Sequence, residues 1–393
     1  MRAWRDSPGT GREPVVVAAR RTPIGTASHA FKALTVDRLA APVVAAVARD
    51  VESLGVPVED VVLGNCTGPG GNIARISALA AGMGHGVPGV TVDRQCGSGL
   101  AAILLAGQAI RSGEMDLVVA GGAESASTAP LRAHRGLAGE EDVPYERAPF
   151  VPAGYADPDM GPAAEALAAA RGVTRDRQDA YAYQSHAKAL AAREAGRFGQ
   201  EIVALDGRQD DQWPRALRMR SLSRLPAAFV PGGTVTAGNS SPVSDGAAAV
   251  AVVPERLRAA EGLPGLRLRA GAVVGCDPGL PGLGPVLAVR RVLRRAGADL
   301  ERVAAVEIVE AFAAQVLAVT DELGLDPLGS DADRVCADGG ALALGHPWGA
   351  TGAVVVTRLF SRLVRSGAPP GTLGLATAAV GGGLGVAALF EVV

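Results

Sequence analysis

The apolar positions of the chain form short runs that alternate with longer segments in which apolar residues recur at helical intervals. The short runs predict strands and lie at 15–19, 61–64, 90–92 and 117–120. The longer segments predict helices and lie at 39–54, 73–83 and 99–110. This alternation predicts an α/β fold with a largely parallel sheet that carries helices on its faces.

The middle of the chain has a different character. Pro, Arg, Asp and Gly are frequent between about 127 and 233, where the clear helical patterns are at 162–170 and 175–195. The strand-and-helix pattern returns afterwards. We therefore expect an N-terminal half at 14–126 that is completed by 234–257, an inserted loop domain at 127–233, and a C-terminal half at 258–393.

The later half also repeats the order of features in the earlier one. The earlier features are Cys96-Gly-Ser-Gly99 before a predicted helix, Ile110-Arg-Ser-Gly113 at its end, and Leu117-Val-Val-Ala-Gly-Gly122. Their counterparts are Gly349-Ala-Thr-Gly352, Val364-Arg-Ser-Gly367, and 373–379 followed by Gly381-Gly-Gly383. Coincidence in a Gly/Ala-rich chain is the alternative. Two similar halves would place two helix N-termini against one central site.

Composition narrows the function classes. The 393 residues suit two or three packed domains, and 52 glycines with 4% aromatic residues indicate a core of small aliphatic side chains. A formal charge of -2 gives no footprint for nucleic acid or an anionic membrane. No apolar stretch reaches a membrane span, and 1–14 lacks the apolar core of a signal peptide, so we expect a cytoplasmic protein.

The cysteines and histidines do not suggest a metal site. The four cysteines are far apart and form no Cys-x-x-Cys pair, which argues against a structural zinc and against a disulfide framework. The five histidines show no paired spacing suited to a metal. Each cysteine therefore needs its own explanation.

Cys96 and His346 are the candidates for covalent chemistry. Cys96 lies between a short apolar run and a predicted helix, and a sulfur at a helix N-terminus is stabilised as the thiolate that attacks carbonyls. A lone cysteine is more often a small buried residue, but the strand-turn-helix context favours a nucleophile. His346 precedes the helix of the other half, where it could take the thiol proton or hydrogen-bond a thioester oxygen. A structural histidine is the alternative.

The glycine run at 381–385 offers two interpretations. A dinucleotide-binding loop would need a following helix pattern and a later acidic residue, which this run lacks. The better interpretation is an oxyanion site, in which backbone N–H groups of this run and the N–H of Cys96 bind a thioester carbonyl.

Six motifs, in this order, resemble signatures of the thiolase family, and the resemblance spans about residue 14 to the C-terminus. They are Cys96-Gly-Ser-Gly99, Val119-Ala-Gly-Gly-Ala-Glu-Ser125, Gly233-Thr-Val-Thr-Ala-Gly-Asn239, Ser244-Asp-Gly-Ala-Ala-Ala249, Glu310-Ala-Phe-Ala-Ala-Gln315 and Gly345-His-Pro-Trp-Gly-Ala-Thr-Gly352. The resemblance implies a thiolase fold: two similar βαβαβαββ halves form an α-β-α-β-α layered sandwich, and the inserted loop domain covers the pantetheine arm of coenzyme A.

The resemblance also implies roles for individual residues. Cys96 would be the acylated nucleophile, His346 its base, and the N–H of Gly381 part of the oxyanion hole, with Glu310 in support. The residues expected along the substrate are Ser241, Met160, Phe312, Ala313 and Gly345. We expect no tightly bound cofactor and no metal. The expected partners are an acyl thioester substrate and further copies of the chain, in a dimer or tetramer.

Three positions of the expected site, and a fourth at Pro226, depart from the family pattern. Thiolases usually have an asparagine where this chain has Val309, and that asparagine holds a water that polarises the second thioester carbonyl. They usually have a second cysteine, the acid/base for the α-carbon, where this chain has Ala379. The histidine that usually precedes Met-Gly appears as Asp159, and an arginine that often stacks on adenine falls at Pro226. A carrier-bound acyl group is therefore an alternative to acyl-CoA as donor.

Three functions follow. The first is an acyltransferase that forms acyl-Cys96 from an acyl thioester and passes the acyl group to a carbon, oxygen or nitrogen acceptor. The second is a conventional acetyl-CoA C-acetyltransferase or 3-ketoacyl-CoA thiolase, in which Asp159, Cys336 or His346 replaces the missing acid/base. The third is a non-catalytic thiolase-like subunit of a complex.

Overall fold

The computed structural model describes residues 11–137 and 139–393, and its strands are shared between two similar halves. In the N-terminal half, the strand order is β1 (Pro14–Arg21), β8 (Ser244–Pro254), β5 (Val118–Ser125), β3 (Asp60–Gly64) and β4 (Val90–Val92), with the short β2 (Gly25–Thr26) beside β8. In the C-terminal half, it is β9 (Leu266–Gly275), β12 (Leu384–Val392), β11 (Leu373–Val380) and β10 (Val303–Ile308). A short antiparallel contact between β1 and β9 joins the two halves.

The prediction of a largely parallel sheet is wrong. Parallel pairing is confined to β3 with β4, β3 with β5, and β10 with β11. The other neighbours pair antiparallel, including β8 with both β1 and β5. The reason is in the connections, because β12 follows β11 through a tight turn and not through a helix, so the two strands must run in opposite directions.

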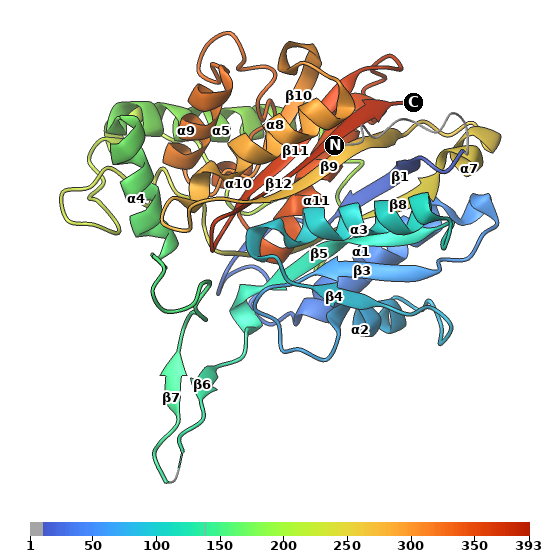
Figure 1. Cartoon of the computed structure of the whole chain (residues 1–393), viewed down its shortest axis with the longest axis horizontal. Coiled ribbons are helices and arrows are strands. Elements are labelled where there is room, and N and C mark those ends of the chain that lie inside the picture. The colour runs from blue at the N-terminus through green and yellow to red at the C-terminus, as the bar shows by residue number, and fades with distance from the viewer. Residues whose placement is uncertain (1–10, 138) are drawn as a thin grey trace.

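Helices separate and cover the two halves, giving the α-β-α-β-α sandwich (Figure 1). The outer helices of the N-terminal half are α1 (Val36–Asp50) and α2 (Ile73–Ala80). Those of the C-terminal half are α8 (Gly284–Ala296) and α9 (Ala313–Leu323). The central layer consists of α3 (Ser98–Ser112) and α11 (Trp348–Leu359), which pack against each other and against strands of both halves. Their apolar side chains belong to one buried core with those strands.

The two central helices cross at equivalent glycines. A Cβ on Gly99 would lie 2.8 Å from the backbone nitrogen of Ala353, and a Cβ on Gly352 would lie 2.3 Å from that of Leu100. Any side chain at either position would push the helices apart. The motifs that the sequence pairs as counterparts therefore meet at the centre of the molecule, which brings the start of α3 close to the start of α11.

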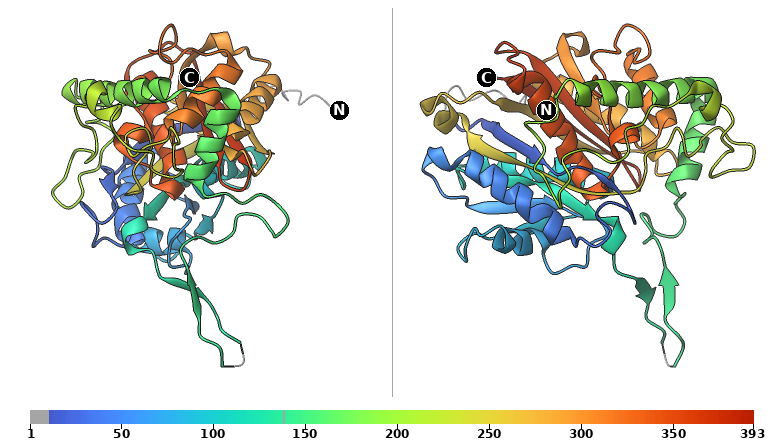
Figure 2. Two further views of the ribbon diagram at one scale, coloured as in Figure 1. Left: turned by 90° about the vertical axis from the view of Figure 1, so that its left-hand side faces the viewer. Right: turned by 180° about the vertical axis from the view of Figure 1, so that it is seen from behind.

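The middle region projects from this sandwich and also folds over it. Figures 1 and 2 show the hairpin of β6 (Arg132–His134) and β7 (Val143–Tyr145) extending away from the body of the molecule. The helices that follow are α4 (Met160–Arg171), α5 (Arg175–Glu194) and α6 (Met219–Leu222). Both α4 and α5 pack against α9, so this region lies on the C-terminal half. Two short helices complete the fold, α7 (Glu255–Ala260) and α10 (Ala341–Leu344).

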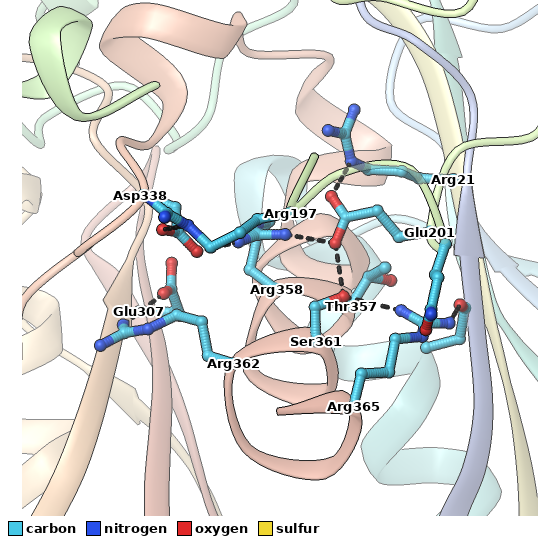
Figure 3. A network of polar contacts seen from close by, with 12 residues as sticks. Arg21, Arg197, Glu201, Glu307, Asp338, Thr357, Arg358, Ser361, Arg362 and Arg365 are labelled. Atoms are coloured by element: carbon cyan, nitrogen blue, oxygen red, sulfur yellow. Dashed lines mark hydrogen bonds and ion pairs between the residues drawn. The ribbon is translucent and has the colours of Figure 1, made fainter. Parts of the chain in front are cut away.

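A buried network of charges ties the middle region to both halves (Figure 3). Glu201 accepts hydrogen bonds from Arg21 Nε at 2.7 Å and Ser361 Oγ at 2.6 Å, and it also pairs with Arg358. Arg21 and Arg358 are at most 1% exposed, and Glu201 is fully buried. Burial alone would raise the pKa of Glu201, but the guanidiniums of Arg358 and Arg21 hold it below its usual value. The carboxylate is therefore charged and fully paired.

Most of the segment that bears on a signal peptide, residues 1–10, lies outside the described residues. None of the helices in the described part of the chain combines the length and the apolar character needed to cross a membrane.

Candidate active site

A cavity of about 560 Å³ opens between the two halves and the middle region. Both starts of the central helices contribute to its wall, because Cys96 and His346 line it together. Across residues 11–137 and 139–393, no three His, Cys, Asp or Glu side chains are grouped in a way that suits a metal ion.

Cys96 lies in a tight turn between β4 and α3. A 3₁₀ turn spans Gln95–Gly97, and Gln95 adopts a φ of 45°, a conformation that non-glycine residues rarely take. The Ser98 hydroxyl accepts a hydrogen bond from Arg94 N and donates one to Gln95 O, both at 2.7 Å. These bonds close the turn on itself and fix the position of the cysteine at the start of the helix.

The expected stabilisation of a Cys96 thiolate is not what the structure shows. Burial raises the pKa of the Cys96 thiol to about 12 and outweighs a backbone hydrogen bond that lowers it, while the charges of Glu124 and Asp93 add smaller increases. The effect of a helix N-terminus is smaller than the cost of burying an unpaired charge. The Cys96 side chain is therefore a neutral thiol at rest, and if it acts as the expected nucleophile its proton must pass to a base.

His346, the expected base, lies just before α11. Its Nδ1 lies 2.8 Å from Thr351 Oγ1, and the Thr351 hydroxyl donates to Pro347 O at 2.9 Å. With the single hydroxyl proton used in that bond, Nδ1 acts as the donor and Nε2 keeps a free lone pair. Nε2 is buried and has no hydrogen-bond partner among residues 11–137 and 139–393. Burial lowers the pKa of His346 to about 4, so the ring is neutral and able to accept a proton.

Gly381, the third expected catalytic group, also lines the cavity. A Cβ at this position would lie 2.6 Å from the ring of Phe150, so only glycine leaves the backbone in place beneath that ring. A Cβ on Gly97, next to Cys96, would similarly lie too close to the side chain of Val380, at 2.8 Å. The turn that follows β11 and the turn that holds Cys96 are therefore in direct contact.

The expected substrate residues fall into two groups. Met160, Ser241 and Phe312 line the cavity, and the ring of Phe312 packs edge-on against Phe229. The other two lie behind the wall. Ala313 is fully buried in the first turn of α9, and Gly345, with a φ of 114°, packs against Ser244.

Glu310 lies away from the cavity and fastens helices to one another. It accepts hydrogen bonds from Tyr181 Oη and Ser185 Oγ, each at 2.7 Å, and from Leu342 N at 3.2 Å. Burial raises the pKa of its carboxyl. Because these donors belong to α5 and α10, Glu310 holds the segment that leads into His346.

The three departures lie in different surroundings. Val309 is 1% exposed and belongs to the central core, whereas Ala379 lines the cavity. Asp159 precedes α4 outside the cavity wall, where its carboxylate bonds Arg147 at 2.9 Å. Cys336 is buried outside the cavity wall too, with its sulfur 3.4 Å from Ile308 O. Neither Asp159 nor Cys336 can therefore replace an acid/base at the substrate, and of the three expected substitutes only His346 reaches the cavity.

Sequence reasoning missed Cys66 as a residue of this site. It lines the same cavity as Cys96, and its sulfur lies 3.7 Å from Ser98 Oγ. The signal was present, because Cys66 follows the apolar run at 61–64 just as Cys96 follows the run at 90–92. These runs form β3 and β4, which pair in parallel, so the residues after them meet at one sheet edge.

The site thus combines a thiol and a neutral histidine at two helix starts, within one cavity of a five-layered α/β sandwich. The thiolase N-terminal domain family matches residues 14–256, and the thiolase C-terminal domain family matches 264–392. The chain belongs to the thiolase family.

Two relatives and one solved structure show the extent of the similarity. The acetyl-CoA acetyltransferase of Pseudomonas aeruginosa is 41% identical over 404 residues, covering 96% of this chain and 98% of that protein. The acetyl-CoA acetyltransferase of Chromobacterium violaceum is 39% identical over 403 residues, covering 96% and 99%. The crystal structure of the Bacillus anthracis acetyl-CoA acetyltransferase matches with a TM-score of 0.87 and 37% identity, over 97% of this chain and 99% of that one.

Proposed function

We propose that this chain is an acetyl-CoA C-acetyltransferase that moves acyl groups between coenzyme A thioesters through an acyl-Cys96 intermediate. The observation that carries the proposal is the unpartnered Nε2 of His346 on the same cavity wall as the Cys96 thiol. Relatives about 40% identical over nearly the whole chain carry the name acetyl-CoA C-acetyltransferase, which favours a carbon acceptor.

The first half-reaction follows from the resting charges. His346 Nε2 takes the proton of Cys96 as the sulfur attacks the thioester carbonyl, because a free thiol with a pKa of about 12 is a poor nucleophile at neutral pH. The N–H groups of Cys96 and Gly381 stabilise the developing oxyanion. The bond to the coenzyme A sulfur then breaks and leaves the acyl group on Cys96.

A second candidate, acyl transfer to an oxygen or nitrogen acceptor, is favoured by one observation. Ala379 lines the cavity at the position where the family resemblance expects an acid/base cysteine, and alanine cannot move a proton from the α-carbon. An alcohol or amine acceptor requires no carbanion. A carrier-bound thioester is the matching alternative for the donor.

Two measurements test these candidates. Incubation with acetyl-CoA, followed by intact-mass measurement, is expected to show an acetyl adduct that Cys96→Ala lacks. Thiolysis of acetoacetyl-CoA is expected to exceed the rate of the same variant. An adduct without thiolysis would support the second candidate, and no adduct from a panel of acyl-CoA and acyl-carrier donors would contradict both.

A non-catalytic subunit is a poorer fit to the buried, unpartnered imidazole, which a scaffold would not need. Iodoacetamide labelling at neutral pH would not distinguish a catalytic cysteine from an inert one. Burial raises the pKa of Cys96 whether or not the residue is catalytic, so slow labelling fits both roles. Adduct formation with acetyl-CoA is the informative measurement.

We also propose that the chain assembles into a dimer or tetramer. The hairpin that projects from the molecule carries apolar side chains in the open, since Leu131, Leu137 and Val143 are at least 60% exposed. Apolar side chains gathered on a projecting element favour a protein contact. Light scattering coupled to size exclusion would give the mass in solution, and a monomer of 39.6 kDa would contradict the proposal.

A further inference from the structure

Cys66 is a second thiol in the cavity for which the proposed first half-reaction has no use. Its sulfur is 3.7 Å from the hydroxyl of Ser98, which belongs to the turn that holds Cys96. At Gly64, a Cβ would lie 2.6 Å from Gly99 N, so the end of β3 packs directly on the first turn of α3. The backbone therefore sets Cys66 against the nucleophile's own turn.

The segment that carries Cys66 is held by a buried carboxylate. Glu124 accepts hydrogen bonds from Cys66 N at 3.1 Å, from Thr67 N at 3.0 Å and from the Thr67 hydroxyl at 2.5 Å. It also accepts one from Gly349 N at 2.9 Å, at the start of α11. Glu124 is fully buried. A single rigid group thus fixes Cys66 relative to the helix that follows His346.

We propose that Cys66 is the acid/base that moves the proton of the substrate α-carbon, in place of the cysteine that thiolases usually have at the position of Ala379. This inference rests on the proposed carbon–carbon chemistry. It is carried by the shared cavity wall of Cys66, Cys96 and Ala379, and by the unpartnered Nε2 of His346, which is 96% buried on that wall.

The protons balance through both half-reactions. When the coenzyme A sulfur leaves acyl-Cys96, the Cys66 thiol gives it a proton and becomes a thiolate, while His346 keeps the proton that it took from Cys96. The Cys66 thiolate then removes a proton from the α-carbon of a second acyl-CoA. That carbon bonds to the carbonyl carbon on Cys96, the bond from this carbon to the Cys96 sulfur breaks, and His346 returns its proton to the departing sulfur.

The surroundings of Cys66 suit a thiol that ionises only during turnover. Burial, and then the charges of Glu124 and Cys96, raise its pKa, whereas the hydrogen bond with Ser98 lowers it. Cys96 is neutral both as a resting thiol and as a thioester, so it places no charge beside a thiolate at Cys66. The Ser98 hydroxyl, which donates to Gln95 O, can turn and donate to a thiolate at Cys66 instead.

The test compares three variants with the wild-type chain. Cys66→Ala removes the thiol, and Cys66→Ser keeps a hydroxyl for Ser98 but cannot ionise at neutral pH. Cys276→Ser is the matched control, because Cys276 is a half-buried cysteine outside the cavity wall. The readouts are α-proton exchange of acetyl-CoA in D₂O, thiolysis of acetoacetyl-CoA, the acetyl adduct on Cys96 and the melting temperature.

We expect both Cys66 variants to lose exchange and thiolysis by about 10²–10⁴-fold in kcat, the usual contribution of a positioned acid/base. The acetyl adduct should still form, because a coenzyme A thiolate can take its proton from water after leaving. Cys276→Ser should behave like the wild type. Adding Ala379→Cys to Cys66→Ala should restore part of the exchange, since a thiol then faces the cavity again.

The failures are distinguishable. A Cys66→Ser variant that exchanges protons at the wild-type rate would overturn the inference and leave the proposed function intact. Joint loss of the adduct and of thermal stability in both Cys66 variants would assign Cys66 a packing role and also overturn it. A wild-type chain that forms the adduct without exchange or thiolysis would overturn the inference together with the carbon acceptor. No adduct at all would overturn the proposed function itself.

Discussion

The two helix starts that face the cavity present different groups, yet both groups are neutral at rest. Burial raises the pKa of Cys96 before α3 to about 12 and lowers that of His346 before α11 to about 4. The ordinary pKa values of a thiol and an imidazole already favour the neutral pair at pH 7, and burial moves both groups further from ionisation. The comparison teaches that burial, and not the helix N-terminus, determines the resting charges of this site.

The two sides also differ in what accompanies each group. On the side of the N-terminal half, a second thiol, Cys66, follows β3 and lines the cavity. On the side of the C-terminal half, the penultimate residue of β11 is Ala379, and Val309 after β10 is buried in the core. The halves are alike in backbone but not in chemistry, because proton-moving side chains other than His346 come from the first half.

Removing the proposed nucleophile should have the largest effect on activity of all the changes to the two helix starts. Cys96→Ala is expected to abolish the acetyl adduct and to lower thiolysis by about 10⁴-fold or more, since no other step can begin without the thioester. Stopped-flow absorbance of acetoacetyl-CoA would measure the rate. A residual rate near that of the wild type would mean that another residue carries the acyl group.

Removing the base should cost less. His346→Gln is expected to lower the rate of acylation by about 10²–10⁴-fold, because the neutral thiol then has no acceptor for its proton. His186→Gln is the matched control, since burial also lowers the pKa of His186 to about 4 and this residue lies off the cavity wall. Equal losses in the two variants would show a general effect of burying a glutamine.

The pH dependence of alkylation would sharpen the contrast between the two groups. Because the thiol has a pKa of about 12, its thiolate fraction should rise about tenfold per pH unit across neutral and mildly alkaline pH. Iodoacetamide labelling of the Cys96 peptide, followed by mass spectrometry, would give the slope. A plateau below pH 8 would instead indicate a thiolate that His346 stabilises as an imidazolium pair.

The smallest effect is expected at the crossing of the two central helices. Gly99→Ala and Gly352→Ala should each destabilise the protein by about 1–3 kcal/mol, because each new methyl group meets the backbone of the other helix. Gln108→Ala on the exposed face of α3 serves as the control. Thermal unfolding would rank the three variants, and a loss at only one of the glycines would show that the crossing is not symmetric.

Much of the fold could be predicted from the sequence because the strands and helices are locally encoded. The predicted strand at 90–92 is β4, and the predicted helix at 175–195 differs from α5 by one residue. The direction of each strand was harder to predict from the sequence, because it depends on which neighbouring strands are connected without a helix between them. The start of α1 at Val36 and the presence of Pro42 inside that helix also run against the local signals.

The candidate site was predictable where a motif fixes a residue and less so where packing decides. Cys96, His346 and Gly381 reach one cavity, as the two-half pattern predicts. The charge of Cys96 was not predictable, because it depends on burial by segments far along the chain. Assigning Cys66 to the site required knowledge of the pairing of β3 with β4. The separation of Cys66 from Cys96 in the sequence does not indicate that Cys66 lies against Ser98, in the turn that holds Cys96.

The charge cluster around Glu201 has a consequence for how the chain is made. Arg21 is synthesised early, Glu201 midway and Arg358 near the end, yet all three are neutralised together in the interior. Before Arg358 has left the ribosome, these guanidiniums and carboxylates cannot all be buried with their partners. The cluster can therefore be completed only after Arg358, the latest of these three residues in the chain, has been synthesised.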